Sequence, residues 1–484
     1  MISGDLLKIA ESPGFCENLR AMKKLFLCFF VLLLNLTAFS QQKTPVDLIV
    51  RGGSVVTMDA QKRVVENGAI AVKDGKIVAV GKADEIARQF TAKQIVEANG
   101  KAIIPGLINT HTHAPMSLFR GIADDLDLNE WLTKYIFPAE AKNVNEQFVR
   151  AGTRLALAEM IRGGTTTYCD MYYFEDAIAD ETAKAGVRGV LGETIIRFPV
   201  ADNKTPEEAI AYTERFVNKW RNHRLIVPAY APHAPYTLTE AQLRAVRASA
   251  DKLNATVVIH VAETRKEVED VTKENGARPV EYLARINFLN NKTIAAHVVF
   301  ANDNELDILK RLNVGVAHNP SSNMKLASGV APVPQMLLKD VFVGLGTDGA
   351  ASNNDLSMWE EMDAAAKLHK LMSNDPKVVS AEQAFEMATI RGARALHLEK
   401  EIGSLEAGKR ADIVIVDLDN FNQIPMYNIF SHLVYATKAN DVRHVIIEGR
   451  LIMQDRRLLT LNEKVIKAET VAFQKQIVSS LKTK

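Results

Sequence analysis

Short apolar runs alternate with longer amphipathic stretches between residues 102 and 346, and each apolar run is a predicted strand. The predicted strands are Ala102–Asn109, Thr165–Cys169, Val187–Gly192, Leu225–Tyr230, Thr256–Ile259, Thr293–Ala296, Val314–Ala317 and Val341–Gly346. Between two of them, Asn145–Ile161 has helical spacing and stops at Gly163-Gly164, a pair typical of helix ends. Eight alternating units over roughly 285 residues predict an α/β fold with a (β/α)8 TIM-type barrel. A doubly wound open sheet is the alternative.

The segments on either side of this alternation have the pattern of short antiparallel strands. Their predicted strands are Val46–Met58, Ala69–Val72, Lys76–Val80 and Ala411–Asp417, followed by a hairpin of Val442–Glu448 and Arg450–Gln454. Asp74-Gly75 and Asn99-Gly100 are typical hairpin turns. Neither segment alone has enough strands for a stable core. We therefore expect one small β-sandwich domain built from both ends of the chain.

The residues before this domain have a different character. Met22-Lys23-Lys24 precedes an apolar run, Leu25–Phe39, and Ala38-Phe39-Ser40 then offers small residues before Gln41. This is the pattern of a secretory signal peptide, and synthesis that begins at Met22 would fit it. The run is roughly 15 residues, short for the ~20 of a spanning helix, so an uncleaved anchor is the lesser alternative. We expect an exported, periplasmic protein without stable membrane insertion after cleavage.

Five regions follow from these patterns. They are an N-terminal extension with the signal peptide (1–40), the first part of the β-sandwich (41–104), the barrel (105–399), the second part of the β-sandwich (400–460) and a C-terminal helix (461–484).

Composition and charge narrow the class of protein. The 484 residues are 47% hydrophobic and 24% charged, which is ordinary for a soluble globular protein. The net charge is +1 and no basic stripe is visible, so nucleic acid is not an expected partner. Cys16 and Cys28 lie in the leader, which leaves Cys169 alone and excludes an intramolecular disulfide.

Histidines gather where predicted strands end. Six of the eleven lie at such ends, namely His111, His113, His233, His260, His297 and His318, whereas His223, His369, His397, His432 and His444 are scattered and are assigned packing or surface roles. In a barrel of this kind the chemistry lies at the carboxyl ends of the strands. The strand ends therefore predict the site.

Three of these histidines and one carboxylate suit a metal. His111 and His113 are two residues apart, so both face one side of the first strand. With His260 and Asp348 they give three nitrogens and one oxygen, which suits one divalent ion, Zn²⁺ first and Fe²⁺ as an alternative. Such an ion lowers the pKa of a water molecule.

Two further residues are candidates for proton transfer. Glu263 lies three residues after His260 and could carry a proton from water to the leaving group. His297 could hold the attacking hydroxide and stabilise developing charge, or serve a structural role instead.

The chain resembles the amidohydrolase superfamily, in particular the branch of methylthioadenosine/S-adenosylhomocysteine deaminases and triazine chlorohydrolases. The matching stretches include Pro105–His113, Phe137-Pro138-Ala139-Glu140, Pro232–Tyr236, His260–Glu263, His318–Asn323 and Gly346–Asp348. The resemblance implies that His111, His113, His260 and Asp348 bind the metal and that Glu263 is the acid/base. It also implies that Glu140 and His233 contact the nucleoside, with Glu140 on the ribose hydroxyls. Arg197 is a looser match to a substrate arginine.

These features predict a hydrolytic deaminase of adenosine-type nucleosides, which are 5′-methylthioadenosine, S-adenosylhomocysteine or adenosine. In this reading Glu263, His297 and Asp348 are the catalytic residues, and we expect a homo-oligomer. One alternative is an aminohydrolase or chlorohydrolase of another nitrogen heterocycle, such as guanine, a pterin, cytosine or a triazine. The remote alternative is a binding protein without activity. Export departs from the usual cytoplasmic location of these deaminases.

Overall fold

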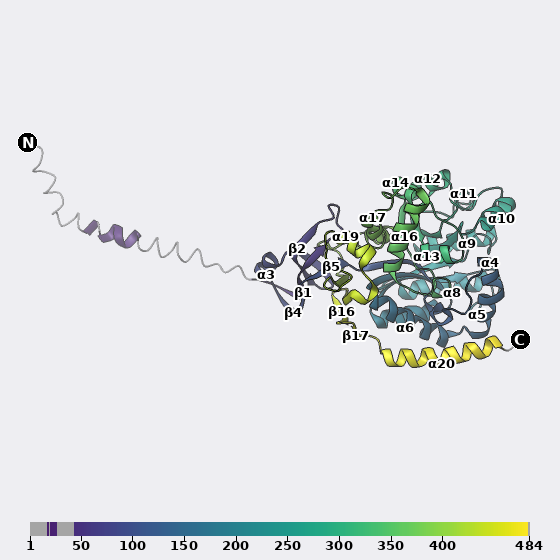
Figure 1. The fold of residues 1–484 in the computed structure, drawn as a ribbon, viewed down its shortest axis with the longest axis horizontal. Coiled ribbons are helices and arrows are strands. Elements are labelled where there is room, and N and C mark those ends of the chain that lie inside the picture. The colour runs from purple at the N-terminus through teal and green to yellow at the C-terminus, as the bar shows by residue number, and fades with distance from the viewer. Residues whose placement is uncertain (1–16, 19, 27–42, 483–484) are drawn as a thin grey trace, which may run out of the picture. The chain divides into compact units, whose positions relative to one another are not determined.

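The structure is a computed structural model that describes residues 17–18, 20–26 and 43–482 (Figure 1). The chain divides into two compact units, residues 1–45 with 87–91 and residues 46–86 with 92–484. In the first unit, residues 17–18 and 20–26 are helical. Most of the predicted apolar run Leu25–Phe39 and the cleavage position after Ser40 lie outside the described residues. Within the described part of the chain, no helix combines the length and apolar character needed to span a bilayer.

The second unit contains the predicted barrel as an eight-stranded parallel sheet in sequence order, β6 to β13. Its strands are β6 (Leu107–Thr112), β7 (Thr165–Tyr172), β8 (Arg188–Ile195), β9 (Ile226–Pro232), β10 (Thr256–Val261), β11 (Thr293–His297), β12 (Gly315–His318) and β13 (Phe342–Leu345). This arrangement confirms the barrel and excludes the doubly wound alternative, because strand order in a doubly wound sheet reverses in the middle.

The predicted first strand, Ala102–Asn109, is wrong as a single element. It is two strands in two sheets, β5 (Lys101–Pro105) in a mixed sheet and β6 in the barrel. The change falls at Gly106, whose N–H donates to the Asp412 carbonyl, while the Leu107 N–H donates to the Gly164 carbonyl. A Cβ at position 106 would lie 2.0 Å from Thr166 Oγ1, so only glycine fits where the chain crosses.

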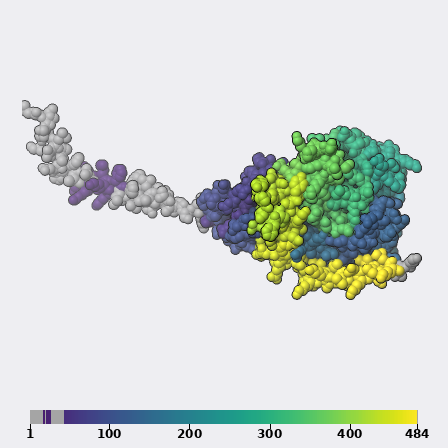
Figure 2. Space-filling view, in the orientation of Figure 1, coloured from purple at the N-terminus to yellow at the C-terminus, as the bar shows by residue number. Residues whose placement is uncertain are grey.

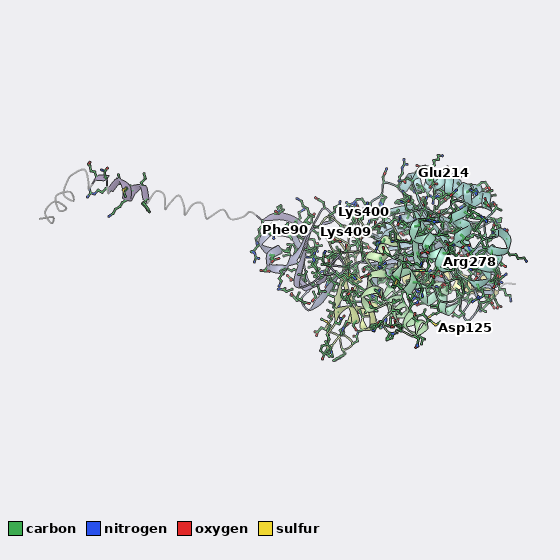
Figure 3. The ribbon with its side chains drawn as sticks, turned by 90° about the horizontal axis from the view of Figure 1, so that it is seen from above. Phe90, Asp125, Glu214, Arg278, Lys400 and Lys409 are labelled. Atoms are coloured by element: carbon green, nitrogen blue, oxygen red, sulfur yellow. The ribbon has the colours of Figure 1, made fainter. Side chains whose placement is uncertain are left out.

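Helices follow the barrel strands as expected. The main ones are α6 (Glu146–Arg162), α7 (Glu175–Ala185), α8 (Pro206–Trp220), α9 (Glu240–Leu253), α10 (Arg265–Asn275), α11 (Pro279–Arg285), α12 (Asp303–Arg311), α13 (Pro320–Lys325), α14 (Val333–Leu338), α15 (Ala350–Asn353), α16 (Met358–Ser373), α17 (Ala381–Met387) and α18 (Ile390–Ala395). The predicted helix Asn145–Ile161 is α6, and the Asn145 side chain accepts the Phe148 N–H as its N-cap. Arg278, labelled in Figure 3, precedes α11 and pairs with the buried Glu305 of α12 at 2.8 Å.

Between β6 and α6 the chain forms a cap segment, defined as residues 114–143. It contains η1 (Ala114–Phe119), α4 (Leu128–Glu130), the π-helix η2 (Trp131–Ile136) and α5 (Phe137–Asn143). Asp125, labelled in Figure 3, belongs to the exposed turn between η1 and α4.

The predicted second domain is present as one mixed sheet of nine strands among the described residues. Its order is β17-β16-β15-β14-β5-β1-β2-β3, and β4 also pairs with β1. The strands are β1 (Thr44–Val56), β2 (Val64–Lys73), β3 (Lys76–Lys82), β4 (Phe90–Glu97), β5, β14 (Ile413–Asp417), β15 (Val442–Ile447), β16 (Arg450–Gln454) and β17 (Arg457–Leu458). β14 pairs antiparallel with β5, so the late segment completes the early one, as the sequence predicts.

The remaining elements are short, except for the last. They are α3 (Ala83–Gln89), α19 (Ile429–Ser431), η3 (His432–Ala436), η4 (Ala439–Asp441) and α20 (Glu463–Lys482). α20, yellow in Figures 1 and 2, lies along α5 and α6, where the Phe473 ring packs edge-on against Phe148 at 5.7 Å. Arg154 of α6 also pairs with Glu469 at 2.9 Å, so an ion pair adds to the contacts between α20 and α6.

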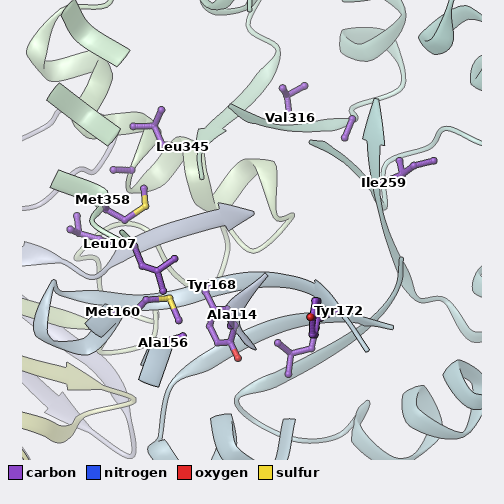
Figure 4. Close-up of a cluster of buried hydrophobic side chains, with 14 of the residues drawn as sticks. Leu107, Ala114, Ala156, Met160, Tyr168, Tyr172, Ile259, Val316, Leu345 and Met358 are labelled. Carbon is purple, nitrogen blue, oxygen red and sulfur yellow. The ribbon is translucent and has the colours of Figure 1, made fainter. Parts of the chain in front are cut away.

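One large apolar core supports the barrel. Figure 4 shows part of it, where Leu107 and Tyr168 from the strands meet Met160 and Ala156 of α6. Tyr172 at the end of β7 belongs to the same cluster. The core therefore reaches the carboxyl ends of the strands, where the site residues lie.

We predict that Gly106→Ala lowers the free energy of unfolding by about 1–3 kcal/mol, because the new methyl group overlaps Thr166 in a packed interior. Denaturant titration would measure the change. Gly163→Ala is the matched control, since a Cβ there meets nothing closer than 3.5 Å, and it should change stability by less than about 1 kcal/mol. Equal effects of the two substitutions would contradict the packing argument.

Candidate active site

The four predicted metal ligands converge at the mouth of the barrel, and we call them the ligand group. His111 lies in β6, His113 follows it, His260 lies in β10 and Asp348 follows β13. Asp348 Oδ1 is 3.3 Å from His113 Nε2 and 3.6 Å from His111 Nε2. The His260 ring centre is 5.0 Å from that of His111. Residues up to 237 positions apart in sequence thus face one small volume.

Backbone carbonyl groups orient two of the imidazoles. His113 Nδ1 donates to the Met171 carbonyl at 2.5 Å, and His260 Nδ1 donates to the His233 carbonyl at 2.8 Å. A proton fixed on Nδ1 leaves Nε2 as the free lone pair, which is how histidine ligands of metals are usually held. Both rings therefore present Nε2 to the ligand group.

Hydrogen bonds also fix the Asp348 carboxylate. Ser322 Oγ donates to Oδ2 and the Gly349 N–H donates to Oδ1, each at 2.7 Å. The Asp348 N–H donates to the His111 carbonyl at 2.9 Å, which joins the two ends of the barrel sheet. Asp348 has φ of 60°, a left-handed conformation that costs a residue with a side chain about 1 kcal/mol or more.

The low pKa values of His111, His260 and Asp348 suit a cation, whereas His113 must release a proton when the ion binds. Burial lowers the pKa of His111 and of His260 well below the usual value, and neighbouring histidines add to this effect. Burial also opposes a proton on His113, but Asp348 outweighs it and raises the pKa of His113 to about 9. Burial alone would raise the pKa of Asp348, yet the hydrogen bond with His113 holds it well below its usual value.

Unpaired atoms support the same conclusion. Both ring nitrogens of His111 are buried without a hydrogen-bond partner, which is costly unless something else satisfies them. Three imidazole nitrogens and one carboxylate oxygen are a donor set for zinc or a similar divalent ion. The residues present therefore fit one metal ion.

Glu263 and His297 lie beside the ligand group. Glu263 Oε2 is 3.8 Å from His297 Nε2, and burial is the main cause that raises the pKa of Glu263. The Glu267 carboxylate accepts the N–H groups of Ala262 and Glu263, each at 2.7 Å. Ala262 has φ of 52°, so this carboxylate secures a strained turn. The Glu267 carboxylate thus fixes the backbone of Glu263, the predicted acid/base.

The orientation of His297 comes from the loop after β12. His297 Nδ1 lies 3.0 Å from Asn323 Oδ1 and 3.3 Å from Asn319 Nδ2. Donation of the Nδ1 proton to Asn323 leaves Nε2 free toward Glu263. His318 takes no part here, because its Nε2 lies 3.1 Å from His369 Nε2 in a separate buried pair.

A pocket opens from the ligand group, and Glu140 and His233 line it. Tyr172 Oη donates to Glu140 Oε1 at 2.7 Å. Burial raises the pKa of Glu140 to about 7, although the Tyr172 hydrogen bond acts in the opposite direction. Burial lowers the pKa of His233 to about 3, so its imidazole is neutral near pH 7. Both predicted substrate residues therefore share one cavity with Glu263.

Arg197 is not among the residues that line this pocket. Its side chain is exposed, and its backbone N–H donates to the Thr237 carbonyl at 3.2 Å. Thr237 Oγ1 in turn lies 3.4 Å from His233 Nδ1. Arg197 thus sits near the loop that carries His233, outside the pocket wall.

Sequence reasoning missed several residues that hold the site together, chiefly Tyr172, Ser322 and Glu267. Thr264-x-x-Glu267 reads as a helix start, and Thr264 does cap α10. However, the Glu267 carboxylate binds the turn that carries Glu263, and no local pattern indicates this. The role of Tyr172 depends on its position at the end of β7, where it meets Glu140 of the cap segment, and no local sequence pattern indicates this contact.

Comparison with known proteins gives the family. Residues 102–452 match the Amidohydrolase family, and residues 68–92 match the bacterial imidazolonepropionase-like composite domain. A Syntrophobacter fumaroxidans protein named 5-methylthioadenosine/S-adenosylhomocysteine deaminase is 47% identical over 416 residues, which cover 86% of this chain and 95% of that protein.

Solved structures agree with this match. An adenosine deaminase of Xanthomonas campestris with bound zinc is 39% identical with a TM-score of 0.89, and the match covers 90% of this chain and all of that one. The atrazine chlorohydrolase of Arthrobacter aurescens shares the fold at 22% identity and a TM-score of 0.82, over 88% of this chain and 100% of its own. With a family match across both the barrel and the end of the mixed sheet, this chain belongs to the amidohydrolase family.

Proposed function

We propose that this protein is a metal-dependent hydrolase that deaminates adenosine-type nucleosides and releases ammonia. The candidate substrates are 5′-methylthioadenosine, S-adenosylhomocysteine and adenosine. One observation carries the proposal, namely that a single pocket is lined by three residues of the ligand group (His113, His260 and Asp348), by the acid/base candidate Glu263 and by a second buried carboxyl group, Glu140. The first two serve the reacting ring, and the third suits the sugar.

The metal would be held by His111, His113, His260 and Asp348, and we propose Zn²⁺, with Fe²⁺ as the alternative. A divalent ion at this place lowers the pKa of a water molecule so that hydroxide is available near neutral pH.

The protein's own groups then handle the protons. Glu263, raised in pKa by burial, protonates a ring nitrogen of the purine, which opens C6 to attack by hydroxide. His297 Nε2, 3.8 Å from Glu263, stabilises the oxygen that adds to C6, and Asp348 accepts its proton. Asp348 passes this proton to the amino group, the C6–N bond breaks and ammonia leaves, while the proton from Glu263 stays on the ring nitrogen of the product.

Glu140 and His233 recognise the nucleoside in this proposal. Tyr172 occupies Glu140 Oε1, which leaves Oε2 to accept from the ribose hydroxyls. Neutral His233 can donate or accept one hydrogen bond with the purine.

Another nitrogen heterocycle without a sugar, such as guanine or a triazine, is the alternative substrate class, since the ligand group and Glu263 would serve it equally.

We also propose export to the periplasm, on the basis of the leader pattern in residues 22–40. Mass spectrometry of the mature N-terminus would decide where the chain begins.

The purified protein should contain about one divalent ion per chain, because one ligand group is present. His111→Ala should lower the metal content by tenfold or more, since it removes a buried ligand and leaves three. Elemental analysis by mass spectrometry measures both. His223→Ala, in the turn after α8, is the control and should keep its metal. Full occupancy in His111→Ala would exclude it as a ligand.

Glu140→Ala should lower kcat/KM for nucleosides by about 100-fold, because ribose hydroxyls lose a charged acceptor. Turnover of any free base that the enzyme accepts should change less than about threefold. A spectrophotometric ammonia assay over both substrate classes measures this split. Glu207→Ala removes an exposed carboxylate from α8 and should leave both classes unchanged. Equal losses on both classes would refute the ribose role.

The KM for nucleosides should depend on pH through Glu140. Because its pKa is raised to about 7, the carboxyl group holds a proton below that pH and cannot accept from both hydroxyls. KM should therefore rise toward tenfold per pH unit below pH 7 and level off above it. In Glu140→Gln the KM should be higher and flat between pH 6 and 8. Parallel profiles in the two proteins would assign the titration to another group.

A further inference from the structure

The pocket has an apolar wall that the proposed reaction does not use. Its side chains come from the cap segment, and they are Met116, Leu128, Trp131, Leu132, Ile136 and Phe137. The ionisable residues that line the pocket are histidines, tyrosines and the carboxyl groups of Glu140, Glu263 and Asp348. No lysine or arginine lines the pocket in the part of the chain that the structure describes.

The apolar wall is continuous with the proposed ribose contact. Ile136 and Phe137 precede Glu140 by four and three residues where η2 runs into α5, so the three side chains share one helical face. The Tyr172 hydrogen bond fixes Glu140 on that face. The 5′ carbon of a nucleoside is bonded to the ring carbon next to the one that bears the 3′ hydroxyl, so binding of the hydroxyls to Glu140 brings it within reach of this apolar surface.

Two lysines near the pocket are already paired, and Arg265, two residues after Glu263, is exposed and packs over the Phe300 ring. Lys134 of η2 binds Glu130 at 3.0 Å and is 67% exposed. Lys325, which precedes the pocket residue Leu326, pairs with Asp124 and with Asn354. Arg197 is exposed and outside the pocket wall. A carboxylate on the 5′ substituent would thus enter without a cationic partner.

Such a carboxylate would be unfavourable for two reasons. It would lose its hydration against apolar side chains, which is costly for an unpaired charge. It would also approach the Glu140 carboxylate in a medium of low dielectric constant. A methylthio or methyl group at the same place would gain from burial instead.

We infer that the pocket selects adenosine-type nucleosides with a short, uncharged 5′ substituent, and that it discriminates against S-adenosylhomocysteine, whose 5′ thioether ends in an amino acid. This inference rests on the proposed deaminase function and narrows its substrate class. The residues that set the preference are Leu132, Ile136 and Phe137 of the cap segment.

Ammonia release should be compared for 5′-methylthioadenosine, 5′-deoxyadenosine, 5′-butylthioadenosine and S-adenosylhomocysteine. The butylthio compound has a chain of similar length to homocysteine without its charges. We expect its kcat/KM to stay within about tenfold of that for methylthioadenosine, and that for S-adenosylhomocysteine to fall by about 100-fold. Equal values for S-adenosylhomocysteine and methylthioadenosine would overturn the inference. A matching loss for the butylthio compound would assign the effect to length and overturn it as well.

Two variants sharpen the test. Leu132→Arg, at a half-buried position, should raise the ratio of S-adenosylhomocysteine to methylthioadenosine turnover by about tenfold, whereas Leu132→Gln should not. Arg197→Ala should leave the ratio as in the parent protein. A selective loss of S-adenosylhomocysteine turnover in Arg197→Ala would show that this arginine serves the carboxylate, against the inference. Absence of ammonia from every nucleoside would instead refute the deaminase proposal itself.

Discussion

The seam between the first and last barrel strands is the constraint on which the site depends. Asn109 bridges it, because its Nδ2 donates to Thr347 Oγ1 at 2.7 Å while its Oδ1 accepts the Thr347 N–H at 3.1 Å. Two residues further along, the Asp348 N–H binds the His111 carbonyl. Closure of the barrel therefore brings the Asp348 carboxylate and the His111 imidazole together. The same hydrogen bonds offset the strain of the left-handed backbone conformation at Asp348.

Buried carboxyl groups hold the remaining loops of the mouth by accepting backbone N–H groups. Asp170 accepts from Ala114 at 2.7 Å, directly after His113. Glu267 does the same for Ala262 and Glu263, and Glu361 accepts from Ser321 at 3.2 Å. Burial raises the pKa of Asp170 to about 7 and that of Glu267 to about 8, so these groups are expensive to ionise. They accept hydrogen bonds from backbone N–H groups that have no partner within a strand or helix, and so they order these loops.

The alternation of strands and helices and the placement of histidines at strand ends were enough to predict the barrel, a small β domain built from both chain ends and the convergence of His111, His113, His260 and Asp348. The pairing of that β domain into one mixed sheet was not predicted. The break at Gly106 was missed in the strand prediction, although Pro105-Gly106 is a break signal and the predicted domain boundary falls beside it, because the flanking residues read as one apolar run. The reason that glycine is needed there is Thr166, a distant residue. The roles of Tyr172 and Ser322 were missed for a similar reason. Each depends on a hydrogen-bond partner that is distant in sequence, Glu140 for Tyr172 and Asp348 for Ser322.

The carbonyl groups that orient the ligand imidazoles belong to residues whose side chains have other tasks. The His233 carbonyl holds His260, while the His233 side chain lines the pocket. The Met171 carbonyl likewise holds His113. Because the backbone carbonyl of residue 233 orients His260, a substitution of the His233 side chain can change which ring the pocket binds and still leave the His260 imidazole in place. A barrel with this arrangement can change its substrate through single substitutions that leave its metal ligands in place.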